Sequence, residues 1–434
     1  MKKPIWIQGG TIIDPINNRE EVADLYVNDG RIVENLSTEQ KEKAFIIEAQ
    51  DKIVSPGFID INVSFCEPGG SHREGIRSGS KAAAAGGFTC VVAMPNTNPP
   101  CDTAGTIQFI KDAVERESII KIMPSGCLTK AREGEFLASM GSLKKAGICA
   151  VTDSGRSLQN NALMERAAEY AKMFDLVVLD PCIDDNLTEG SSMNHGPTAL
   201  KLGLRGSPRA AEDIMVSRNV ILSTYSEARI HLQSISSAYS VEIIRRAKQR
   251  GVKITADTTP HHIFFTDDCI EGYDTRYKTN PPIREKSDIE ALLEGLKDGT
   301  IDCIASNHRP YTRDEKDIEF DLAPAGIIGL ETALPVVLDK LHFKNAFSLT
   351  EVVNLLSIMP SKVLNMKPPE LSIGSEADLT IFDPNAQKSI TEETLFSKSK
   401  NSPWLKSSLP GVVEATCVSG EVVFYKGKFP TVSI

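Results

Sequence analysis

The sequence predicts an α/β protein, a (β/α)₈ TIM-type barrel joined to a small β-sandwich domain built from both chain ends. Short apolar segments alternate with helical patterns through the middle of the chain, as they do in a barrel of parallel strands covered by helices. Both ends instead carry strand and turn patterns. The chain has 434 residues, 41% of them hydrophobic, which is enough for one large barrel and an accessory domain.

Eight short apolar segments in the middle region have the length and composition of buried strands. Helical patterns separate them, for example in 160–174, 237–251 and 287–299. Unusual residues gather where the segments end, and in barrels this carboxyl-terminal face carries the active site. The predicted strand segments are 58–65, 89–96, 120–126, 148–155, 176–183, 229–236, 253–262 and 302–310.

The two chain ends are predicted to form one β domain together. Residues 5–15 and 23–36 are typical of short strands, with a turn at Asn28-Asp29-Gly30. Residues 377–384 and 411–429 show the same pattern near the other end. Each end alone is too small for a stable sandwich. We therefore expect a composite domain of residues 1–55 and 366–434, and a barrel domain of residues 56–365.

Composition excludes several classes of function. The net charge of −10 argues against nucleic-acid binding, which needs a basic face. The amino-terminal segment lacks the apolar core of a signal peptide, and no apolar run has the length of a membrane span. The nine cysteines show no CxxC pair, as expected for reduced thiols. These features predict a cytoplasmic protein that binds neither nucleic acid nor membrane.

Long segments of the chain, in the same order, resemble the class I dihydroorotases of the amidohydrolase superfamily. The resemblance implies a barrel with a composite β domain. It also implies interconversion of dihydroorotate and N-carbamoyl-aspartate in pyrimidine biosynthesis. The segments that carry it are 56–70 (PGFIDINVSFCEPGG), 81–99, 254–268, 277–288, 292–312, 319–337 and 376–384.

The resemblance also implies which positions should carry the chemistry, and most of them hold other residues. Two His at i and i+2 on one strand can bind one metal ion, but the family's His-x-His pair corresponds here to Asn62 and Ser64. An Asn replaces the catalytic Asp, and an amide cannot act as a general base. The remaining matches are Cys66 for the substrate-binding Arg, Asp153 for a bridging carboxylate, Pro181 and Ser234 for metal-binding His, and Asn307 for the catalytic Asp.

These replacements predict a degenerate site with no cofactor, and Asp153 as the surviving ligand position. A weaker alternative is a zinc site rebuilt from Cys66, Cys182, Asp153 and His308. Arg309 is a candidate substitute for the lost substrate-binding Arg, although a surface salt bridge is the favoured interpretation. The substrate positions that the resemblance retains are Asn96, Asn280, His308, Ala325 and Gly326.

Three functional hypotheses follow from these matches. The favoured one is a non-catalytic dihydroorotase-like subunit, a pseudoenzyme that scaffolds or regulates aspartate carbamoyltransferase as a partner. The alternative is an active dihydroorotase or related cyclic amidohydrolase with an atypical or rebuilt site. A third hypothesis is a protein that binds a carbamoyl-aspartate-like ligand without turnover. The resemblance also predicts a homodimer.

Overall fold

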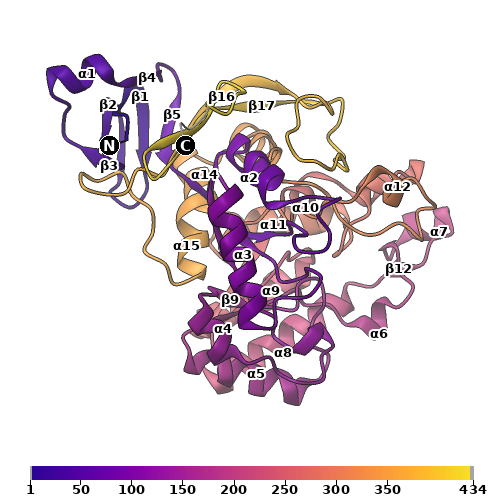
Figure 1. Cartoon of the computed structure of the whole chain (residues 1–434). Coiled ribbons are helices and arrows are strands. Elements are labelled where there is room, and N and C mark those ends of the chain that lie inside the picture. Colours follow the sequence, from indigo (N-terminus) through magenta and orange to yellow (C-terminus); the bar gives the residue numbers. More distant parts are fainter. Residues whose placement is uncertain (1, 431–434) are drawn as a thin grey trace.

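Eight short parallel strands close into the predicted barrel. The computed structural model describes residues 2–430 (Figure 1). Each predicted strand segment contains one strand. Hydrogen bonds join three of these strands in one group and five in another. Bridges between Gly126 and Val151 and between Val63 and His308 close the ring. The strands are β6 (Phe58–Val63), β7 (Phe88–Ala93), β8 (Lys121–Pro124), β9 (Ala150–Val151), β10 (Val177–Asp180), β13 (Ile230–Leu232), β14 (Ile254–Thr258) and β15 (Cys303–Ile304).

Helices follow the strands in the order expected of a (β/α)₈ barrel. In α5, Asn160 caps the first turn by accepting from the backbone N–H of Leu163. Met164, Ala167, Ala168 and Ala171 repeat at helical spacing and are buried. The main covering helices are α2 (Ile76–Ala85), α3 (Ala104–Glu117), α4 (Met140–Ala146), α5 (Asn161–Met173), α8 (Ala210–Ser226), α9 (Ala238–Gln249), α11 (Lys286–Lys297) and α13 (Ala333–Val337).

Apolar side chains fill the interior of the barrel. Ile59 and Ile61 of β6 pack in one buried cluster with residues of β7, β10 and β15. Val363 of α15 (Met359–Val363) and the adjacent Leu364 belong to the same cluster. The barrel is therefore a packed core, although a few polar side chains such as Asp60 of β6 and His231 of β13 are also buried within the strands. The chain reaches α15 through η4 (Leu338–Phe343), α14 (Leu349–Val353) and η5 (Asn354–Ile358).

The two chain ends share one eight-stranded sheet, as predicted. Its order is β18-β17-β16-β5-β1-β2-β3, with β4 paired to the first half of β1. Buried residues from both ends, such as Ile7, Leu25, Leu379 and Cys417, form one core. Residue 1 and residues 431–434 of the predicted composite domain lie outside the described residues. The strands are β1 (Ile5–Asp14), β2 (Arg19–Asn28), β3 (Arg31–Val33), β4 (Phe45–Glu48), β5 (Ile53–Pro56), β16 (Leu379–Ser389), β17 (Ser408–Val418) and β18 (Glu421–Tyr425).

Shorter elements lie in the connections, including those that follow the barrel strands. None of the helices within residues 2–430 combines the length and apolarity needed to cross a membrane. The short elements are α1 (Thr38–Lys43), η1 (Lys130–Arg132), α6 (Asp185–Thr188), β11 (Met193–Asn194), α7 (Pro197–Leu202), β12 (Gly206–Ser207), α10 (Pro260–Phe264), η2 (Asp267–Gly272), η3 (Thr275–Tyr277) and α12 (Arg313–Lys316).

Candidate active site at the barrel mouth

Five barrel strands are followed by a non-glycine residue in the left-handed backbone region. Such residues are uncommon, and they concentrate at functional sites and tight turns. All five lie at the mouth of the barrel, in the segments where the family resemblance places metal-binding, substrate-binding or catalytic residues. They are Cys66, Ser154, Cys182, Ser234 and Asn307, with φ between 33° and 57°. The backbone frame of a barrel active site is therefore present in this chain.

Asn62 and Ser64 lie where the first strand meets the last. The backbone carbonyl of Asn62 accepts from the N–H of His308 at 3.2 Å, and the N–H of Ser64 donates to the carbonyl of His308 at 2.9 Å. The Ser64 hydroxyl donates to Oδ1 of Asn96 at 3.2 Å. Both residues are buried, so this corner of the mouth is fixed by hydrogen bonds.

Asp153 anchors a neighbouring loop. Its Oδ1 accepts from the N–H groups of Leu128 and Thr129 at 2.9 and 3.0 Å, and its Oδ2 accepts from the Thr129 hydroxyl at 2.5 Å. Burial raises the pKa of this carboxyl, and the hydrogen bonds only partly offset that effect. Both oxygens are thus already engaged by the protein.

The other matched positions offer weak or occupied donors. Pro181 has no ligand atom in its side chain, and the buried Ser234 hydroxyl has no hydrogen-bond partner. Oδ1 of Asn307 accepts from Nε of Arg309 at 2.8 Å. A zinc site needs three or four His, Cys or carboxylate ligands. Residues 2–430 contain no group of three or more such side chains arranged to hold a metal ion, so the residues present do not fit the family's metal.

The residues predicted to rebuild a zinc site, Cys66, Cys182, Asp153 and His308, do not form a metal-binding group among residues 2–430. The Cys182 thiol points toward α8, where Nδ2 of Asn219 donates to its sulfur at 3.3 Å. That sulfur also lies 3.4 Å from the carbonyl of Asp180. Burial raises the pKa of the Cys66 thiol to about 11, so the free thiol is protonated at neutral pH and is a poor nucleophile.

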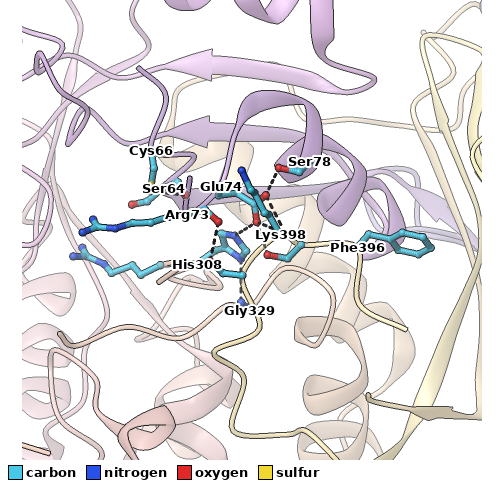
Figure 2. A network of polar contacts seen from close by, with 12 residues as sticks. Ser64, Cys66, Arg73, Glu74, Ser78, His308, Gly329, Phe396 and Lys398 are labelled. Atoms are coloured by element: carbon cyan, nitrogen blue, oxygen red, sulfur yellow. Dashed lines mark hydrogen bonds and ion pairs between the residues drawn. The ribbon is translucent and has the colours of Figure 1, made fainter. Parts of the chain in front are cut away.

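His308 and Glu74 link the mouth to the carboxyl-terminal part of the chain. Nδ1 of His308 accepts from the N–H of Gly329 at 3.2 Å, and its Nε2 lies 3.7 Å from Oε2 of Glu74 (Figure 2). Glu74 is fully buried and also accepts from the hydroxyls of Ser78 and Ser397. The network holds the loop after β15 against residues 397–398, which makes His308 a positioning residue.

Replacing Glu74 should test this network through its pH dependence. Burial alone raises the pKa of Glu74, but His308 and the two hydroxyls outweigh it and leave the pKa below the usual 4.5. The carboxylate therefore stabilises the fold fully above about pH 4.5, and less as the pH falls through the lowered pKa. We expect Glu74→Gln to reduce the unfolding free energy by about 1.5–3 kcal/mol at pH 7.

Urea unfolding at pH 7 and at lower pH measures that difference, which should shrink on acidification. Glu115→Gln on the exposed face of α3 is the matched control and should change little. An equal loss for Glu74→Gln at both pH values would contradict a charged Glu74.

A cavity of about 230 Å³ opens at the mouth beside these residues. Asn96, Ser64 and Cys66 line it together with Arg73 and Arg309. Of the predicted substrate positions only Asn96 lies in its wall. Asn280 is exposed, and His308, Ala325 and Gly326 do not line it. The carbonyl of Gly326 is used within the protein, since it accepts from Lys316 and Asn401.

Sequence reasoning missed three charged residues of the mouth. Arg73 pairs with Glu315 and stacks over the Tyr311 ring, and Glu74 forms the buried network. Arg132 donates to the carbonyls of Asp153 and Ser154. The only signal for the first two was their place just after the first strand, and Arg132 had none.

Solved structures of known proteins identify the fold class of this chain. An L-hydantoinase (dihydropyrimidinase) structure from Arthrobacter aurescens superposes with a TM-score of 0.86 at 21% identity, covering 98% of this chain and 97% of that one. A dihydropyrimidinase from Brevibacillus agri gives 0.83 at 22% identity, covering 98% and 96%. Likeness at this identity shows the fold, an amidohydrolase-type barrel with an accessory sheet.

Sequence relatives give the family. A family described as "Dihydro-orotase-like" matches residues 51–240. A dihydroorotase from Caldanaerobacter subterraneus subsp. tengcongensis is 42% identical over 424 residues, covering 98% of both chains. A dihydroorotase from Geotalea daltonii is 44% identical, covering 96% of this chain and 99% of that one. The chain belongs to the dihydroorotase-like family.

These relatives correct the favoured functional hypothesis. A non-catalytic subunit was expected, yet curated proteins that match nearly the whole chain at 41–42% identity are named as dihydroorotases. They support the alternative of an active enzyme. That hypothesis had given most weight to the replaced positions, whereas identity along the rest of the chain points to the family's activity.

Proposed function

We propose that this chain is an active cyclic amidohydrolase that interconverts dihydroorotate and N-carbamoyl-aspartate, as a step of pyrimidine biosynthesis. The observation that carries the proposal is the full-length identity to proteins named dihydroorotase. The left-handed residues at five strand ends support it, because they keep the backbone of a barrel-mouth site. The cavity of about 230 Å³ at this mouth is the proposed place of reaction.

The proposed site works without the family's His-x-His metal pair. Asn62 and Ser64 carry neutral oxygens, and the Asp153 carboxylate already accepts three hydrogen bonds. Zinc at the mouth is the alternative arrangement, for which residues 2–430 hold no group of three or more suitably placed ligands. Without a metal-activated water we expect turnover below the ~10 s⁻¹ that is typical of enzymes.

The experiment is a turnover assay on the purified chain in both directions. Dihydroorotate is followed by its ring absorbance, and N-carbamoyl-aspartate by colour reaction of its ureido group. We expect interconversion above the uncatalysed rate. Dihydrouracil, which has the same ring without the carboxylate, should react more slowly. Faster reaction of dihydrouracil would instead favour a hydantoinase-like specificity.

The oligomeric state of the chain and its association with a partner are also part of the proposal. A homodimer and a complex with aspartate carbamoyltransferase are both predicted from the resemblance. Light scattering of the chain, alone and mixed with the transferase from the same cell, measures both. A larger species in the mixture would support the complex, and separate elution would contradict it.

A further inference from the structure

One positively charged side chain in the wall of the mouth cavity, that of Arg309, has no acidic partner in the described part of the chain. Arg309 is partly buried and lines the cavity, and its Nε donates to Asn307 at 2.8 Å. Within residues 2–430 no carboxylate forms an ion pair with it, so the expected surface salt bridge is not formed. Its terminal nitrogens have no hydrogen-bond acceptor among the described side chains and carbonyls. Two donors of a planar fork are left for a ligand.

The surroundings of Arg309 strengthen its positive field. Burial is the main cause of the lowered Arg309 pKa; Tyr311 opposes the shift, and the nearby charge of Arg132 adds to it. Arg132 itself donates only to backbone carbonyls. The third arginine, Arg73, is already neutralised by Glu315. No acidic residue is among the described residues that line the cavity. A buried or half-buried cation of this kind is stabilised when an anion binds it.

The backbone holds Arg309 in place. Its N–H donates to the carbonyl of Ile327 at 2.8 Å, and its carbonyl accepts from Nδ2 of Asn401 at 2.9 Å. Asn96, which also lines the cavity, uses Oδ1 for the Ser64 hydroxyl and keeps its Nδ2 donor for another acceptor. The cavity thus offers a fixed guanidinium fork and an amide donor.

We propose that Arg309 binds the carboxylate of the ligand, by a bidentate contact from the end of the eighth strand. This inference rests on the proposed function for the identity of the ligand class, a pyrimidine-type ring with one carboxylate. It assigns to Arg309 the role that the resemblance gave to the position of Cys66. Asn96 then donates to an oxygen of the ring.

Calorimetric titration with orotate and uracil tests this assignment without turnover. The two probes share a ring and differ in the carboxylate. We expect orotate to bind the parent chain, and Arg309→Met to weaken it about 10- to 100-fold while leaving uracil binding unchanged. Arg309→Lys should recover part of the loss. Arg313→Met removes the same charge from exposed α12 and should leave orotate binding unchanged.

Urea unfolding of each variant shows that it is folded. Equal orotate affinity for the parent and Arg309→Met, or no orotate binding by the folded parent, would overturn the assignment. Turnover separates this failure from that of the proposed function. If the parent chain is active and Arg309→Met leaves its KM for dihydroorotate unchanged, only the role assigned to Arg309 is contradicted. If orotate binding depends on Arg309 but the chain shows no turnover, only the proposed function is contradicted.

Discussion

Arg218→Met is expected to lower the free energy of unfolding by about 3–5 kcal/mol, because it leaves a buried carboxylate without its cation. Nη2 of Arg218 on α8 lies 3.0 Å from Oδ2 of Asp180, at the end of β10, and both side chains are buried. Arg218 also donates to the carbonyl of Leu158 and to the Ser157 hydroxyl. The pair therefore joins a barrel strand to its covering helix and to the loop that precedes α5.

Urea unfolding at neutral pH measures this loss. Arg229→Met is the matched control, since its partner Asp175 has a 70% exposed side chain, and it should cost less than about 1 kcal/mol. The double variant Arg218→Met with Asp180→Asn should recover part of the loss, because no charge then stays buried. A single-variant loss below that of the control would show that the pair contributes little.

Asp153→Ala is expected to lower the free energy of unfolding by about 2–4 kcal/mol, because it leaves three hydrogen-bond donors in a buried loop without an acceptor. Those donors are the N–H of Leu128 and both the N–H and the hydroxyl of Thr129. Asp153→Asn should cost less, since one acceptor oxygen remains. Asp185→Ala, on the exposed first turn of α6, is the control and should stay within about 0.5 kcal/mol.

The same series separates a structural Asp153 from a metal ligand. Added zinc should not raise the melting temperature of the parent chain, because the carboxylate is already engaged. A zinc-dependent rise that disappears in Asp153→Ala would show that Asp153 binds the metal, and would contradict the structural role.

The fold could be predicted because its signals are local. Apolar strands and helical patterns repeat along the chain, and even β9 and β15, which are two residues each, lie within clear apolar segments. The composite sheet followed from the shortness of each end. Short connections within both regions left few other topologies.

The sequence predicted where along the chain the site residues lie, but not how their side chains are arranged. Sequence comparison located the strand ends, but not the direction of the side chains. The left-handed backbone of Cys182 places its thiol against Asn219, outside any shared metal site. Arg309 was expected in a surface salt bridge, and whether an acidic partner lies near it depends on the tertiary fold. Glu74 was missed for the same reason, since its partner Ser397 lies 323 residues away.

The proposed function requires turnover by a site without the family's metal pair. The most direct test follows dihydroorotate hydrolysis by homogeneous protein that has been treated with a chelator, and then by the same protein with added zinc. Metal analysis of each sample accompanies the rates. We predict turnover above the uncatalysed rate in the chelated protein, with no increase on adding zinc. Turnover only with zinc, or none in either sample, would contradict metal-independent catalysis by this chain.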